Sequence, residues 1–264
     1  MLIAIDHGNY VVKTPHSEFV SGLSEHRVRP PLGDEVLEYA GSFWTLSGKR
    51  LPYMRDKTRD ERWFRLTLFA IAREMEAAGK LGSREEIDLA VGLPPEHYGL
   101  LRERFAKYFK RGNVSFVYKD KPVNLTIRHV LVYPQAYAAV IPQSGVITMN
   151  NEIIGKVSAE HDMRVEDEHI SAVLLGRGTI LPEDVKRTIR TAAEAHARGI
   201  LDQLRELQVD LRTNPAIFIG GGSILFRTLL EHSSMVAQAS FVTDPKANAI
   251  GYELLASSQL RGMP

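Results

Sequence analysis

The sequence contains no cysteine. This excludes disulfide bonds, thiolate catalysis and cysteine-ligated zinc, and it is compatible with a reducing compartment. No run approaches the roughly 18 apolar residues of a membrane-spanning helix. Charge of one sign is not in excess, because 33 Lys and Arg residues balance 32 Asp and Glu residues. Proteins that bind nucleic acid directly usually carry a basic excess. We therefore expect a soluble, cytoplasmic protein with no direct nucleic-acid or membrane partner.

What the chain does have is length and regular patterning. Its 264 residues, 44% of them hydrophobic, suit one large domain or two modest ones. Strand patterns dominate the first part and helical patterns the second, with strand–turn–helix units in both. This alternation predicts an α/β protein with two subdomains, residues 1–135 and 136–264.

Two helices and one further strand are predicted from local patterns. Thr58 followed by Glu61 predicts a capping box, and apolar residues over 64–75 then recur on one helical face. A second long helix is predicted from Pro182, a favourable first-turn residue, to about residue 207. Residues 146–157 have the pattern of a strand.

The first candidate site is the turn Asp6-His7-Gly8-Asn9-Tyr10, with Lys13 three residues beyond. A tight hairpin can direct backbone N–H groups at a phosphate, and glycine allows close approach. Lysine adds a positive charge, and an aspartate at a strand end can hold a metal-bound water. The alternative is an ordinary hairpin turn, since Asp, Gly and Asn are common turn residues.

The second candidate follows a predicted buried strand at residues 216–219. Gly220, Gly221, Gly222 and Ser223 lead from this strand into a helix. Close backbone approach and a helix N-terminus both suit a nucleotide. The spacing matches neither a dinucleotide fingerprint nor a Walker loop. The alternative is a flexible turn.

The third candidate is Gln135, which follows Pro134 at the start of a short alanine-rich segment. A glutamine at the head of a helix can orient an attacking water in phosphoryl transfer. The alternative is a polar residue in a first helical turn, which is more common. Its significance comes from the other two motifs.

The order of these three motifs resembles that of the actin/Hsp70/sugar-kinase superfamily. Three further segments look like the ParM/StbA group of bacterial and phage actin-like proteins: Val91-Gly92-Leu93-Pro94, Asp56-Lys57-Thr58 with the helix after it, and Ala247-Asn248-Ala249-Ile250-Gly251-Tyr252. The resemblance covers nearly the whole chain. It implies an actin-like (ribonuclease H-like) fold of two subdomains, with a nucleotide cleft between them.

The resemblance also implies roles for individual residues. Asp6 would contact the shell of a magnesium ion through water, and Gln135 would orient the attacking water. Backbone donors and Lys13 would hold the phosphates, and the later glycine loop would line the adenosine side. The implied cofactors are ATP or GTP and Mg²⁺. The cofactor-binding residues are Gly8, Asn9, Tyr10, Lys13, Gly220, Gly221, Gly222 and Ser223.

The function implied by the resemblance is a filament-forming ATPase that segregates plasmid or phage DNA. Its partners would be further copies of itself and a DNA-binding adaptor protein that links the filament to centromere-like plasmid DNA. Two alternatives keep the fold: a non-hydrolysing scaffold that only assembles, and a monomeric small-molecule kinase. No sugar-site aspartate motif is apparent, and the chain is short for such a kinase.

One expected motif is missing from the second half. The superfamily places a second phosphate hairpin, Asp-x-Gly-x-x-Thr or similar, soon after the segment that follows Gln135. Nothing matches it near residues 143–144, where a piece of roughly 30 residues would belong. Either the protein has an internal deletion, or the sequence omits a segment. The second is favoured, because losing central strands would expose a sheet edge. An intact mass well above 29.6 kDa would support the omission, and 29.6 kDa would contradict it.

Overall fold

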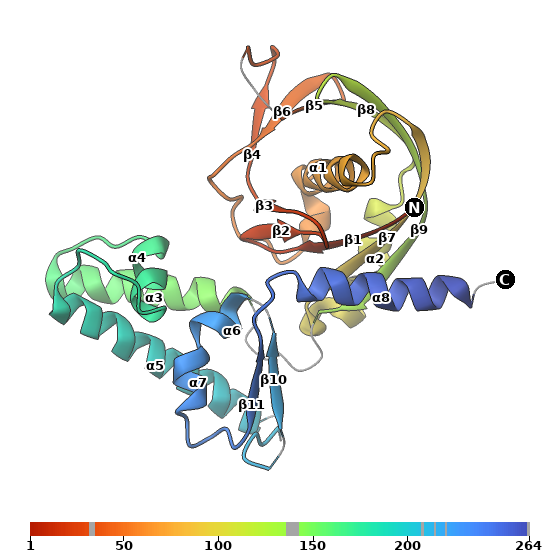
Figure 1. Ribbon diagram of the computed structural model, residues 1–264. Coiled ribbons are helices and arrows are strands. Elements are labelled where there is room, and N and C mark those ends of the chain that lie inside the picture. The colour runs from red at the N-terminus through yellow and green to blue at the C-terminus, as the bar shows by residue number, and fades with distance from the viewer. Residues whose placement is uncertain (32–34, 136–142, 207–208, 214, 220, 263–264) are drawn as a thin grey trace. The chain divides into compact units, whose positions relative to one another are not determined.

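The computed structural model describes residues 1–31, 35–135, 143–206, 209–213, 215–219 and 221–262. Internal contacts divide the chain into two compact units (Figure 1). Unit 1 comprises residues 1–137 and 246–264, and unit 2 comprises residues 138–245. The last helix, predicted as part of a C-terminal subdomain over 136–264, thus belongs to unit 1, because it packs on the strands of that unit.

Unit 1 is built on a nine-stranded mixed sheet. In sheet order its strands are β3-β2-β1-β7-β9-β8-β5-β6-β4. The central strands β1, β7 and β9 are parallel, whereas the flanking pairs are antiparallel. The strands are β1 (Leu2–His7), β2 (Val11–Lys13), β3 (Glu18–Val20), β4 (Leu23–His26), β5 (Val36–Tyr39), β6 (Ser42–Leu46), β7 (Arg84–Leu93), β8 (Gly112–Tyr118) and β9 (Lys121–Pro134).

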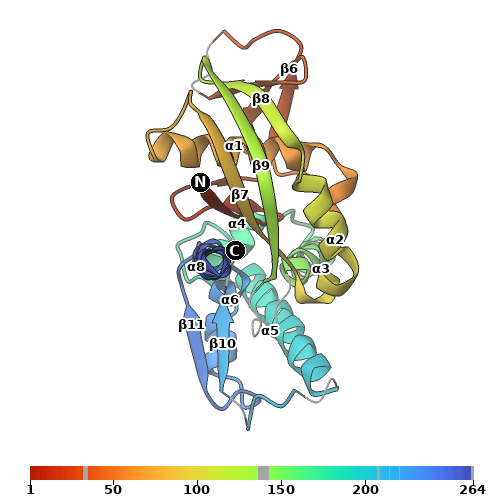
Figure 2. The same cartoon turned by 90° about the vertical axis from the view of Figure 1, so that its right-hand side faces the viewer.

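Helices cover both faces of the central strands of unit 1. They are α1 (Arg62–Ala77), α2 (Pro95–Phe109) and α8 (Ala247–Arg261), with a short 3₁₀ helix η1 (Lys57–Arg59) before α1. The sheet curls around α1, and α8 lies on the opposite side of β1 and β7 (Figures 1 and 2). Side chains alternate along β1: Ile3 and Ile5 join the large core around α1, while Ala4 packs with α8.

The start of α1 differs from the predicted capping box. Thr58 lies in η1, and its amide and hydroxyl both donate to Asp56 Oδ1, at 3.1 and 2.6 Å. The helix begins only at Arg62, after Glu61. Asp56 therefore caps a separate short turn, because an aspartate two residues before an amide accepts its hydrogen bond well. The predicted apolar face over residues 64–75 is fully buried, as expected.

Small residues let α8 approach the sheet closely. Ala4, Ala90, Ala256 and Tyr252 form one buried cluster between α8 and the sheet. A Cβ atom built on Gly92 would lie 2.0 Å from the Tyr252 hydroxyl oxygen, so no larger residue fits there. The glycine in the Val91–Pro94 segment is thus explained by this contact between strand and helix.

Unit 2 is mainly helical. Within the described residues its sheet has two parallel strands, β10 (Ala216–Ile219) and β11 (Ala239–Val242). Its helices are α3 (Gln143–His161), α4 (Asp167–Leu174), α5 (Glu183–Glu206), α6 (Gly221–Leu225) and α7 (Arg227–Glu231). The strand predicted over residues 146–157 is wrong, because this segment lies in α3. Met149, Ile153 and Val157, spaced by four, form its buried face against α5.

Candidate functional site

The carboxylate of Asp6 lies at the end of β1 and is almost fully buried. The side-chain amide of Gln135 donates to Asp6 Oδ1 at 2.7 Å, and that of Asn248 donates to Asp6 Oδ2 at 3.3 Å. These two residues come from the end of β9 and the start of α8. Each oxygen thus accepts one neutral amide, and a carboxylate oxygen can still accept a further hydrogen bond. The site holds a charged acceptor in a fixed orientation.

The turn of residues 8–10 joins β1 to β2 directly beside Asp6. Asp6 pairs with Lys13 in the antiparallel register of these strands, and Lys13 is buried. Ser21 fixes the turn from outside: its hydroxyl donates to the Gly8 carbonyl at 2.6 Å, and its amide donates to the Tyr10 carbonyl at 2.9 Å. The ring of Tyr10 is half exposed. The turn is therefore a supported hairpin with a buried lysine next to a buried carboxylate.

His7 faces the opposite side of β1 and is buried in an aromatic pocket. Its ring stacks on Phe109 with centroids 4.8 Å apart and meets Phe105 edge-on. Thr67 Oγ1 donates to the Trp63 carbonyl, so the 2.8 Å bond between His7 Nε2 and Thr67 Oγ1 has the imidazole as donor. Burial, aided by the nearby Lys57 charge, lowers the pKa of His7 to about 3. The histidine is thus neutral and structural.

Lys57 is a second cation at the same strand end. Its ammonium donates to the His7 carbonyl and lies 4.4 Å from the centre of the Trp63 ring. Burial lowers its pKa to about 8, while the charge of Asp6 opposes that shift. Since the pKa stays above neutrality, the side chain is mostly charged at pH 7. Two lysines therefore flank one carboxylate beside the turn.

The second predicted motif lies in unit 2. Gly221 and Gly222 begin α6, directly after β10, and Ser223 has a buried side chain. Gly220 lies outside the described residues. As the glycine motif predicts, a strand ends just before this residue and a helix begins just after it.

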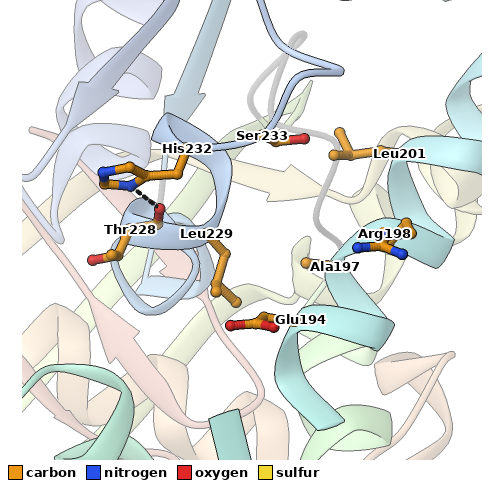
Figure 3. Close-up of a pocket in the computed structure, with 8 residues that line it drawn as sticks. All are labelled: Glu194, Ala197, Arg198, Leu201, Thr228, Leu229, His232 and Ser233. Atoms are coloured by element: carbon orange, nitrogen blue, oxygen red, sulfur yellow. Dashed lines mark hydrogen bonds between the residues drawn. The ribbon is translucent and has the colours of Figure 1, made fainter. Parts of the chain in front are cut away.

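A separate hollow of about 460 Å³ lies between α5 and α7 of unit 2 (Figure 3). Glu194 and Arg198 of α5 line one wall, and His232, whose Nδ1 is 2.7 Å from the Thr228 carbonyl oxygen, lies at the other. The other lining residues are Ala197, Leu201, Leu229 and Ser233. None of the predicted site residues contributes to it.

Of the predicted site residues, those in unit 1 are brought together: Asp6, Gln135, Lys13 and the turn of residues 8–10. Asn248 and Lys57, for which the sequence motifs predict no role, belong to the same group in the structure. Both residues lie in segments that carried the resemblance, so the motif signal was present. The motifs did not indicate that side chains from these two segments reach the end of β1.

This group suits a magnesium-bound phosphate by its chemistry. An oriented carboxylate with lone pairs left can accept from the waters of Mg²⁺, which usually keeps several of them. Lysine ammonium groups and a hairpin turn are common phosphate ligands. The residues present therefore fit such a ligand.

Comparison with known proteins identifies the domain. Residues 32–137 match the family described as the N-terminal domain of actin-like proteins. Over these residues the chain is similar to the N-terminal domain of actin-like proteins. The resemblance predicted from the sequence motifs is thus confirmed. No curated protein matches the chain in sequence.

Solved structures with the actin-like fold match along the whole chain. The apo ParM protein of pSK41 superposes with a TM-score of 0.67 at 13% identity, covering 98% of both chains. Ta0583, an archaeal actin homologue solved with ADP, gives 0.69 at 14% identity and covers 97% of this chain and 99% of its own. The AlfA filament bound to AMPPNP gives 0.59 at 14% identity, with 99% and 98% coverage. The α/β actin-like fold is thereby confirmed, whereas the cleft between subdomains stays a prediction.

Among the described residues, no helix of this actin-like chain combines the length and apolar character needed to cross a membrane.

Proposed function

We propose that this actin-like protein binds and hydrolyses magnesium-ATP and assembles with further copies of itself into nucleotide-dependent filaments. The filament would segregate plasmid or phage DNA through a DNA-binding adaptor. Support comes from the fold, from structural relatives solved with ADP or as a filament with AMPPNP, and from relatives named ParM.

The observation that carries the proposal is the oriented Asp6 carboxylate beside the supported turn. Asp6 accepts from Gln135 at 2.7 Å and from Asn248 at 3.3 Å, and the buried Lys13 lies opposite it on β2. Such preorganisation is characteristic of phosphoryl transfer, in which catalysis depends on positioning and charge stabilisation. A hairpin turn without function does not need a buried carboxylate, which is costly to desolvate.

Each residue then has a defined part. Magnesium supplies charge neutralisation at the phosphates when it is bound. Asp6 accepts hydrogen bonds from the water shell of the metal, and Gln135 orients the attacking water. Backbone amides of residues 8–10 and the Lys13 ammonium bind phosphate oxygens. On the adenosine side, we assign Gly220, Gly221, Gly222 and Ser223 the role of lining the nucleoside.

One observation favours a second function, a scaffold that assembles without hydrolysis. Only eight residues, 135–142, separate the end of β9 from the start of α3. That length cannot hold the missing piece of about 30 residues to which the second phosphate hairpin would belong. Without that hairpin, half of the phosphate clamp is missing and hydrolysis would be slow. An intact mass of 29.6 kDa for the natural protein would favour the scaffold, and a larger mass would favour the ATPase.

Light scattering followed by phosphate release tests the proposal in a single sample. For the ATPase, added magnesium-ATP should raise the scattering, which should decay as phosphate appears. For the scaffold, scattering should rise without phosphate release. No change in either signal would contradict both functions. Asp6→Asn is the matched variant, because it keeps the size of the side chain and removes its charge.

A further inference from the structure

Lys57 is the charged residue of the candidate site to which the proposed mechanism gives no part. It lies in η1, outside the strands and turn that carry the predicted phosphate ligands. Its ammonium nevertheless reaches the end of β1 and donates to the His7 carbonyl, one residue before the turn. A buried lysine is costly unless its charge is used. The contact therefore calls for a reason beyond packing.

The backbone around Lys57 is held to α2 by an ion pair and hydrogen bonds. Asp56 accepts hydrogen bonds from Thr58 and forms an ion pair with Arg104 of α2 at 2.7 Å. Tyr108 of α2 donates its hydroxyl proton to the Asp60 carbonyl and accepts from the Phe64 amide, both at 2.8 Å. The segment before α1 is thus fastened to α2 on both sides of Lys57, so its side chain is directed at one place.

The charges around the turn show what Lys57 contributes. Lys13 and Lys57 are cations, Asp6 is an anion, and His7 is neutral. With both lysines, the strand end carries a net positive charge before any ligand arrives. Without Lys57, Lys13 would be cancelled by Asp6, and a polyphosphate would meet no net attraction. At an effective dielectric constant of about 20, one unit charge roughly 8 Å from a phosphate changes affinity about tenfold or more.

We propose that Lys57 is a positioning residue of the candidate phosphate site: its ammonium fixes the β1 end that carries the turn of residues 8–10 and supplies the positive charge that offsets Asp6. This rests on the proposed function, because it assumes a polyphosphate ligand in unit 1. The fastening role and the charge role are separate, and each has its own measurement.

Two substitutions separate these roles. Lys57→Gln retains a side-chain N–H donor for the His7 carbonyl but removes the charge, whereas Lys57→Met removes both. Lys49, an exposed lysine of unit 1, provides the matched controls Lys49→Gln and Lys49→Met. Affinity for magnesium-AMPPNP would be measured by titration calorimetry, and amide hydrogen exchange would be followed at residues 8–10.

The charge role predicts about tenfold weaker AMPPNP binding in Lys57→Gln, with little change in melting temperature or in exchange. The fastening role predicts faster exchange at residues 8–10 in Lys57→Met. Both Lys49 variants should bind as the wild type does. Wild-type affinity in Lys57→Gln would overturn the charge role, and unchanged exchange in Lys57→Met would overturn the fastening role.

The proposed function and this inference can fail separately. If the wild type binds no AMPPNP, the ATPase and the charge role are both rejected, while the exchange measurement still decides whether Lys57 orders the turn. If Lys57→Met does not fold, Lys57→Gln still decides the charge role, and Lys57→Ala, which also lacks the donor, takes the place of Lys57→Met in the exchange measurement.

Discussion

The two units of this chain are stabilised in different ways. Unit 1 surrounds α1 with a nine-stranded sheet, and its core contains many fully buried aromatic rings. Unit 2, in the residues described, has a two-stranded sheet and depends on the contact between α3 and α5. An isolated pair of strands is only marginally stable. The difference suggests that stability in unit 1 comes from the sheet, whereas in unit 2 it comes from helix packing.

The two units also differ in which elements their side-chain polar contacts join. In unit 1, Arg73 of α1 forms a two-pronged ion pair with Glu35, which also accepts from the Tyr118 hydroxyl on β8. In unit 2, histidines join α3 to α5: His161 contacts Thr188, and His196 contacts Glu152. Unit 1 thus links segments far apart in the sequence, and unit 2 links neighbouring helices. Folding of unit 1 should accordingly be the more sensitive to single changes.

Removing an aromatic ring from the core of unit 1 should have the largest effect on stability. Phe69 is fully buried, with Phe19 and Tyr118 as ring neighbours. We expect Phe69→Ala to lower the unfolding free energy of unit 1 by about 4 kcal/mol, because a large cavity remains. The chain has two tryptophans, Trp44 and Trp63, both in unit 1, so their fluorescence reports on this unit during urea unfolding.

The matched change in unit 2 is Phe226→Ala, since Phe226 is also fully buried. It should shift the unfolding of helices, seen by circular dichroism, and leave the tryptophan transition in place. Equal shifts in both signals for either variant would mean that the two units unfold together, and the distinction between them would fail.

A methyl group at Gly92 should have the next largest effect. Its Cβ would overlap the buried Tyr252 ring, so we expect Gly92→Ala to cost about 3 kcal/mol in unit 1. Gly99→Ala is the control, because Gly99 lies in α2 with nothing within 4 Å of a Cβ atom, and it should stabilise slightly. Adding Tyr252→Leu to Gly92→Ala should recover part of the loss, measured as a double-mutant cycle. Strict additivity would show that α8 does not pack against β7 as described.

Acid should destabilise unit 1 through His7. The folded pKa of about 3 lies below the unfolded value of about 6.5, so the unfolded state binds the proton first. Stability from this group is complete above pH 6.5 and is lost as the pH falls toward 3, at about 1.4 kcal/mol per unit. Compared with His7→Gln, the wild type should lose about 2.5 kcal/mol between pH 6.5 and 4.5 in urea unfolding followed by fluorescence. Parallel curves for the two proteins would contradict a buried neutral imidazole.

The smallest effect is expected at the α3–α5 contact of unit 2. Thr188 Oγ1 donates to Glu160 at 3.0 Å and accepts from His161 Nε2 at 2.9 Å. Thr188→Val keeps the shape and removes both bonds, which should cost about 1 kcal/mol. The change should appear in the circular dichroism transition and not in tryptophan fluorescence. A shift in fluorescence instead would show that unit 2 supports unit 1.

Much of this architecture could be predicted from the sequence. The strand at residues 216–219 and the long helix after Pro182 follow from apolar periodicity and turn residues, which act locally. The strand predicted over 146–157 failed because β-branched residues there also fit a helix, and the burial spacing of four is decided by packing on α5. Local pattern could not supply that partner.

The candidate site was predictable only in part for the same reason. Asp6, the turn and Lys13 are neighbours in the sequence, so their motif could be seen. Asn248 reaches Asp6 from 242 residues away, and Lys57 reaches the His7 carbonyl from 50 residues away. Such contacts are set by tertiary structure alone and cannot be predicted from the spacing of residues in the sequence. Gln135 and Asp6 were likewise predicted as members of separate motifs, and the hydrogen bond between them could not be predicted.

The distance along the chain between Asp6 and its two amide partners has a consequence for synthesis on the ribosome. Asp6 emerges first, Gln135 midway, and Asn248 only with the last helix. A nascent chain therefore carries the Asp6 carboxylate with one of its two amide partners missing until α8 has been synthesised. Prematurely terminated products that lack α8 would leave Asp6 poorly oriented and β1 and β7 uncovered on one face. The site thus depends on α8, and chains that end before this helix would not act as competent subunits.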